Sequence, residues 1–241
     1  MTARDFDQVG KRFALILIYV LLTGIQGPAQ ADELSNGGRT KFEIFGMMNE
    51  YLMTCASFDG ETIERFDSGE VDASARFKEL LPAYCKEEGI AQGFISQASS
   101  DGSVTFISPI IARSIRSHYE EGVFGHGTGA LKESEFANAS NLDLLRYLRG
   151  VYFRNNYKGA EVILAANASS ETHHAGVILS KMGCTGVRIY VNESVPNTFA
   201  LIFSPTPKLR KFLGIKNTVM LEDMNKACGD RLKLREQIGH D

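Results

Sequence analysis

The alternation of short apolar runs with amphipathic segments over residues 122–191 constrains the fold more than any other feature of this chain. The expected elements are a strand over 122–125, a helix over 141–154, a strand over 161–166, a helix over 171–182 and a strand over 187–191. The run Glu161–Ala166 is almost continuously apolar, as suits a central strand buried on both faces. Because strand–helix–strand units build parallel sheets, the pattern predicts an α/β fold with a mostly parallel core sheet.

The remaining segments extend this prediction to the whole chain. The core domain is expected over residues 93–241, with its sheet over about 93–205 and C-terminal helices at 208–213 and 219–234. Before it, residues 32–92 have helical spacing over 40–55 and 72–88, which predicts an N-terminal helical segment. No internal repeat is evident in the sequence.

Residues 1–31 have the layout of an export signal. Lys11 and Arg12 precede an apolar run over 13–25, and the small residues Ala29 and Ala31 follow it. The run is about 13 residues long, shorter than the roughly 20 that span a bilayer. We therefore expect cleavage after Ala31 and a periplasmic or extracellular location, with a retained membrane anchor as the alternative.

Four cysteines follow the signal: Cys55, Cys85, Cys184 and Cys228. An even number of cysteines in an exported chain predicts two disulfide bonds. Of the three possible connectivities, pairing within each half of the chain favours Cys55–Cys85 and Cys184–Cys228. The alternative, metal ligation, has little support because no Cys-x-x-Cys pair is present.

Charge narrows the classes of partner. The formal net charge is −3, and residues of both signs are interspersed. The sequence thus predicts no nucleic-acid partner, which would need a basic face, and no membrane contact beyond the signal. No cofactor is expected either, because the glycine turn at 125–129 lacks the full dinucleotide fingerprint, with Lys132 at the position of its last glycine.

Polar residues follow two of the predicted strands. If those strands are neighbours in a parallel sheet, the following side chains and glycines meet at one rim: Gly125, His126, Gly127, Asn167, Ser169, Ser170, His173 and His174. His126 lies between two glycines, which suits an accessible general base or metal ligand, and equally a turn histidine bonded to the backbone. Ser169 or Ser170 suits a helix N-cap and is also a candidate nucleophile.

Part of this pattern resembles caspase-like cysteine peptidases over residues 122–191. Val123–Gly127 is similar to the family's strand ending in His-Gly, and Glu161–Asn167 to its strand ending in the catalytic cysteine. The resemblance places Ala166 at the nucleophile position, and alanine cannot attack a carbonyl. Cys184 comes a whole helix later and belongs to a predicted disulfide. The resemblance therefore implies an inactive relative, or one whose nucleophile moved to Ser169 or Ser170.

Three functions remain open at this point. The first is a non-enzymatic binding module for a protein, peptide or glycan. The second is a hydrolase that uses His126 as base, with a serine nucleophile or a metal-bound water, and with Asp143 and Glu171 as available acidic partners. The third is an assembly component of the cell envelope.

Overall fold

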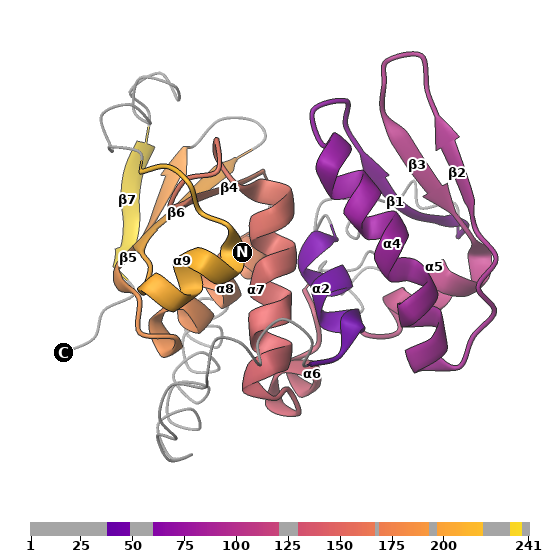
Figure 1. Ribbon diagram of the computed structural model, residues 1–241, viewed down its shortest axis with the longest axis horizontal. Coiled ribbons are helices and arrows are strands. Elements are labelled where there is room, and N and C mark those ends of the chain that lie inside the picture. The colour runs from indigo at the N-terminus through magenta and orange to yellow at the C-terminus, as the bar shows by residue number, and fades with distance from the viewer. Residues whose placement is uncertain are drawn as a thin grey trace, which may run out of the picture. The chain divides into compact units, whose positions relative to one another are not determined.

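The computed structural model describes residues 38–48, 60–120, 130–166, 169–192, 197–218 and 232–237, all within the compact unit 31–241. The chain first forms α2 (Thr40–Met47), β1 (Thr62–Phe66), α4 (Val71–Glu88), β2 (Ile95–Ala98), β3 (Val104–Ile107) and α5 (Pro109–Arg116). After the short α6 (Glu133–Ala137) come α7 (Asn141–Asn155), β4 (Val162–Ala166), α8 (Ser169–Lys181), β5 (Thr185–Asn192), β6 (Thr198–Ser204), α9 (Pro207–Leu213) and β7 (Leu232–Gln237) (Figure 1).

The same order of elements occurs twice. The first repeat (residues 40–116) and the second repeat (residues 141–213) each run helix, strand, helix, strand, strand, helix. The strand order agrees as well, since β1-β3-β2 in the first sheet corresponds to β4-β6-β5 in the second, which adds β7. The absence of a repeat, inferred from the sequence, is therefore wrong at the level of topology.

Both sheets are antiparallel, so the predicted mostly parallel α/β core is wrong. β6 lies between β4 and β5 and pairs antiparallel with each of them, and β3 does the same between β1 and β2. The prediction failed because burial on both faces does not require a parallel sheet. In β4, Ile163 packs into the main core on one face while Val162 joins Tyr190 and Ala200 on the other.

Most of the individual elements were predicted correctly from periodicity. The helices expected at 72–88, 141–154, 171–182 and 208–213 correspond to α4, α7, α8 and α9, and the strands at 161–166 and 187–191 to β4 and β5. β1 was not foreseen. The helix expected over 219–234 is wrong at its end, because β7 begins at Leu232, and the strand expected at 122–125 lies outside the described residues.

Helices α2 and α7 are packed together through two glycines, and Figure 1 shows them side by side. A Cβ atom on Gly46 would lie closer than 3.0 Å to the backbone oxygen of Tyr147, and one on Gly150 would lie as close to that of Glu43. In each case the partner is the residue three positions before the other glycine, so the contact is reciprocal. Only glycine permits this approach, because any side chain would meet backbone that cannot move aside.

The two predicted disulfide bonds are wrong. Cys85 and Cys184 are buried free cysteines, and each belonged to one of the proposed pairs, while Cys55 and Cys228 lie outside the described residues. Cys85 is fully buried in α4 and packs in the core beside Tyr84, where a thiol acts as a small apolar side chain. The prediction failed because it inferred oxidation from export rather than from any property of these positions.

The predicted export signal lies outside the described residues and stays a prediction. Among the helices that the structure describes, none combines the length and the apolar character needed to cross a membrane.

The glycine contact predicts an unusual response to alanine. Replacing an exposed helical glycine by alanine stabilises a helix by about 1 kcal/mol. For Gly150→Ala we expect the opposite sign, a loss of about 3 kcal/mol in the free energy of unfolding, because the methyl group forces α2 and α7 apart. Urea denaturation followed by circular dichroism measures the change.

Gly93→Ala is the matched control, since nothing lies within 4 Å of a Cβ placed there and the backbone φ is not positive. Its unfolding free energy should change by less than about 0.5 kcal/mol. A Gly150→Ala variant as stable as the parent chain would contradict the close approach of the two helices.

Candidate functional site

A cavity lies where the carboxyl ends of α2 and α7 meet. Its volume is about 330 Å³. The first repeat contributes residues at the end of α2 and between β1 and α4, and the second repeat contributes the end of α7, β4 and the first turn of α8. The lining residues are Met48, Asp67, Glu70, Arg154, Asn155, Asn156, Tyr157, Leu164, Ala165 and Glu171. We call this space the helix-end cavity.

Arg154 is the most constrained group in the wall of the cavity. Its side chain is only 4% exposed, with one nitrogen 2.9 Å from Glu70 and another 3.3 Å from the fully buried Glu64. It also donates to the backbone oxygens of Met47 and Arg65, and its guanidinium lies 4.5 Å from the centre of the Phe66 ring. One side chain of α7 thus ties together the end of α2 and strand β1.

Arg154 stays protonated despite its burial. Burial by itself lowers the pKa of a guanidinium, but the carboxylates of Glu64 and Glu70 outweigh this effect and raise the pKa of Arg154 above its usual value. The guanidinium therefore supplies a positive charge to the buried Glu64 and the half-buried Glu70, as buried charges require.

The second repeat contributes a further carboxylate that is also engaged. Glu171, in the first turn of α8, is 4% exposed and accepts a hydrogen bond of 2.9 Å from the side-chain amide of Asn155. Asn156 shapes the adjacent turn, because its side-chain oxygen accepts from the backbone of Gly159. In the described part of the chain, no three His, Cys, Asp or Glu side chains form a group that could hold a metal ion.

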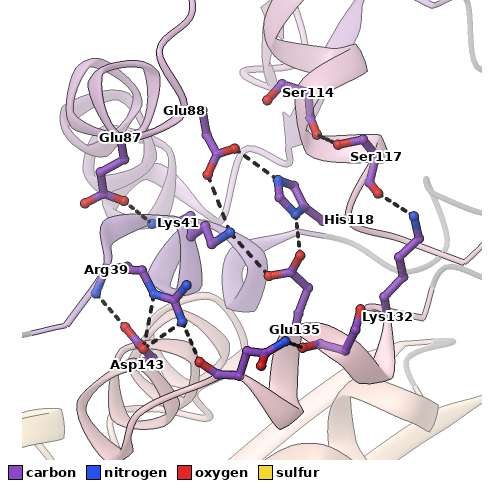
Figure 2. A network of polar contacts seen from close by, with 12 residues as sticks. Arg39, Lys41, Glu87, Glu88, Ser114, Ser117, His118, Lys132, Glu135 and Asp143 are labelled. Carbon is purple, nitrogen blue, oxygen red and sulfur yellow. Dashed lines mark hydrogen bonds and ion pairs between the residues drawn. The ribbon is translucent and has the colours of Figure 1, made fainter.

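A separate polar network lies at the amino ends of the same two helices (Figure 2). The Glu87 carboxylate accepts from the backbone N–H groups of Thr40 and Lys41, at 2.8 and 3.0 Å, and so caps α2 from the end of α4. Asp143 closes a capping box with Ser140 at the start of α7 and also accepts from the backbone and guanidinium of Arg39. The start of α2 is therefore bound on two sides, by Glu87 of the first repeat and by Asp143 of the second.

Asp143 has a strongly lowered pKa. Burial is the largest single influence and would raise the pKa of Asp143, but the hydrogen bonds from Arg39 and Ser140 together lower it to about 2. Asp143 is therefore an anchoring carboxylate that is ionised at neutral pH.

Four side chains, Lys41, Glu88, His118 and Glu135, form a quartet beside these caps, visible in Figure 2. His118 lies 2.7 Å from Glu135 and 3.4 Å from Glu88 through its two ring nitrogens, and Lys41 lies 3.3 and 3.5 Å from the same two carboxylates. Burial would raise the pKa of Glu135, yet the hydrogen bond from His118 and the charge of Lys41 lower it. The imidazole donates to both carboxylates when both of its nitrogens carry protons.

None of the predicted rim residues that the structure describes lines the helix-end cavity. Gly125, His126, Gly127 and Asn167 lie outside the described residues. Ser169 and Ser170 begin α8, as expected for residues at a helix start, and Ser170 is half-buried. A hydrolase based on His126 therefore stays a prediction.

His173 and His174 follow on α8, with ring centres 6.3 Å apart. The ring of His174 packs 4.3 Å from that of Phe136, and burial, helped by the neighbouring His173, lowers the pKa of His174 to about 4. The His174 imidazole is therefore neutral at pH 7 and has a packing role against Phe136. Burial likewise raises the pKa of the Cys184 thiol to about 11, so Cys184 is no nucleophile, although it is not oxidised.

The cavity residues that sequence reasoning missed carried no local signal. Arg154 continues the polar positions of an amphipathic helix, and Asp67 and Glu70 stand in an ordinary polar turn. Glu171 was considered only as a partner for His126. These residues come together only because α2 packs against α7, and no sequence motif predicts that packing.

No protein-family model and no curated protein matches the sequence. Solved structures do match, and one of them comes from a study of mesophilic variants of the homing endonuclease I-DmoI. This chain is similar to it with a TM-score of 0.51 and 10% sequence identity. The match covers 73% of this chain and 93% of that one. At this identity the likeness concerns the fold alone, and it offers nothing for the resemblance to caspase-like peptidases.

The buried ion pairs of Arg154 predict a large loss of stability on its removal. In Arg154→Met, the carboxylates of Glu64 and Glu70 lose their cation, and we expect the free energy of unfolding to fall by about 3–5 kcal/mol. The double variant Arg154→Met/Glu64→Gln should recover part of this loss, because one uncompensated charge is gone. Urea denaturation measures both, with Arg188→Met on an exposed strand position as control. Equal stability of the single and double variants would contradict the role assigned to Glu64.

The lowered pKa of Asp143 predicts the sign of an acid effect. Because the pKa in the folded state is about 2, below the ordinary 3.8, this carboxylate stabilises the fold at neutral pH and loses its contribution as pH falls from about 4 to 2. The difference in urea midpoint between the parent chain and Asp143→Asn should therefore be constant above about pH 5 and shrink below pH 4. Asp72→Asn, at an exposed position of α4, is the control. A difference that persists unchanged to pH 2 would contradict the prediction.

Proposed function

We propose that this chain binds nucleic acid and does not cleave it. The likeness to a homing endonuclease supports binding, because an endonuclease acts on nucleic acid and the two chains share a fold over most of their length. The absence of cleavage is supported by the carboxylates at the helix-end cavity. The observation that carries it is the pairing of Arg154 with Glu64 and Glu70.

Hydrolysis of a phosphodiester commonly relies on carboxylates that hold metal ions at the attacking and leaving oxygens. Such carboxylates need lone pairs directed at the ion. Three carboxylates line the helix-end cavity: Asp67, Glu70 and Glu171. Glu70 faces the guanidinium of Arg154, which also pairs with the buried Glu64, and Glu171 accepts from Asn155. Glu70 and Glu171 do not suit a metal ion, because each has an ionic or hydrogen-bonding partner of the protein's own, and Asp67 alone is not a metal site.

The formal net charge of −3 is a sum over the whole chain, whereas a ligand meets the local charge of one surface. Four carboxylates are at most 4% exposed: Glu43, Glu64, Asp143 and Glu171. Three of them pair with arginines, so these pairs leave the net charge of the rest of the chain unchanged. Binding to nucleic acid therefore depends on where the exposed arginines lie and not on the total charge.

Each sheet presents an exposed arginine on the face away from the main core. Arg65 lies in a row with Thr105 and Gln97 across the first sheet, between buried neighbours on β1. Arg188 lies between the buried Val187 and Ile189 on β5 in the second sheet. Strands of this kind can contact the bases or phosphates of a duplex through arginine and short polar side chains.

Fluorescence anisotropy with labelled duplexes of DNA and of RNA tests the binding. We expect a dissociation constant of about 1–100 μM that weakens steeply with added salt, as phosphate contacts require. Arg65→Ala and Arg188→Ala should each weaken binding and lower the salt slope by about one. Lys208→Ala, at an exposed position of α9, is the matched control and should change neither.

Incubation of the same duplexes with Mg²⁺ or Mn²⁺, followed by denaturing electrophoresis, tests the absence of cleavage. The expected result is intact strands for the parent chain. Specific cleavage would contradict the reading of the helix-end cavity. Failure to bind any duplex at low salt would overturn the proposed function itself.

A further inference from the structure

The two sheets differ at one edge. In the second sheet, β5 pairs with β6 on one side and with β7 on the other. In the first sheet, the corresponding strand β2 pairs with β3, and among the described residues its other edge pairs with no strand. The repeat therefore shows, within one molecule, where a fourth antiparallel strand fits on this fold.

Apart from its short length, β2 lacks the features that usually protect a free edge. All four of its residues are exposed, and Ile95 is 65% exposed. Its sequence, Ile-Ser-Gln-Ala, has no charge and no proline, and its pairing with β3 is regular, whereas the pairings of β1 and β5 contain irregularities. Natural edge strands generally carry lysine, proline or a bulge to prevent pairing with another chain.

The hairpin that presents β2 is held firmly. The backbone N–H of Ser99 donates to the oxygen of Ser103, and Gly102 adopts the positive φ that its turn requires. Asp101 accepts from both the backbone and the hydroxyl of Ser103 and also pairs with Arg65. An edge fixed in this way loses little conformational freedom when a strand is added.

We propose that β2 pairs antiparallel with β2 of a second copy of this chain, so that two three-stranded sheets join into one across a two-fold axis. Identical antiparallel edges are self-complementary about such an axis. The neutral strand meets its own copy without the like-charge repulsion that would oppose pairing. The exposed Ile95, with its cross-strand neighbour Ile107, supplies apolar surface beside the new contact.

A four-residue strand makes a small interface, so the association is a transient one, below the size of stable complexes. Sedimentation velocity over an about 100-fold range of protein concentration is the measurement, since the dimer fraction rises with concentration. It is made in the absence of nucleic acid, so its result does not depend on the proposed function. We expect a reversible shift from monomer to dimer and no larger species.

Charge replacement at the centre of the strand identifies the surface. Gln97→Lys and Gln97→Glu each place like charges opposite or diagonal to one another across the axis, and each alone should abolish the dimer. An equimolar mixture of the two should restore association as a heterodimer, which a misfolded variant could not do. Thr185→Lys, at an exposed position of β5, is the control and should dimerise as the parent chain does.

Three results would overturn the proposal. The first is a chain that stays monomeric at every concentration, which would leave the edge to a different protein or to no partner. The second is a dimer that both Gln97 variants still form. The third is loss of the dimer in each variant without recovery in the mixture, while circular dichroism shows both variants folded.

Discussion

The contact between α2 and α7 is the constraint on which the rest of the structure depends. Gly46 and Gly150 let the backbones of α2 and α7 approach so closely that neither glycine position has room for even a methyl group. The approach is reciprocal, since each glycine faces the carbonyl three residues before its counterpart, and so it relates the two repeats as well as the two helices. Both polar sites follow from it, because the caps of Glu87 and Asp143 lie at the amino ends of this pair and the helix-end cavity lies at its carboxyl ends.

Buried charges specify which surfaces meet. Glu43 on α2 is fully buried and pairs with Arg76 of the first repeat, and Arg146 and Arg149 of α7 also lie within 4.0 Å of its carboxylate. Glu64 on β1 similarly meets Arg154 of the second repeat. Such pairs add little net stability over apolar packing, but a wrong arrangement of the repeats would leave each carboxylate buried without a cation. We infer that these ion pairs mainly make the packing of one repeat on the other specific.

The sequence was informative about elements and uninformative about their arrangement. Apolar spacing located α4, α7 and α8 within a residue or two, because periodicity is a local property. The direction of β4 relative to its neighbour is a non-local property, and the apolar run 161–166 suits an antiparallel strand with a second small cluster on its outer face as well as a parallel one. The candidate site was missed for the same reason. Arg154 and Glu171 look like ordinary helix residues until the packing of two distant helices brings them to one cavity.

Comparing the two repeats shows which positions must be the same in both and which can differ. Gly46 and Gly150 must both be glycine, because a side chain on either one would open the same contact. No comparable contact constrains the sheet edges, and there the two repeats differ among the described residues: β7 extends the second sheet, and β2 is an edge strand of the first. At the helix ends, Arg154 of the second repeat donates to the backbone of Met47 in the first, and this contact lies beside the helix-end cavity. We therefore expect function at the sheet edges and at the cavity, and not at the shared glycine contact.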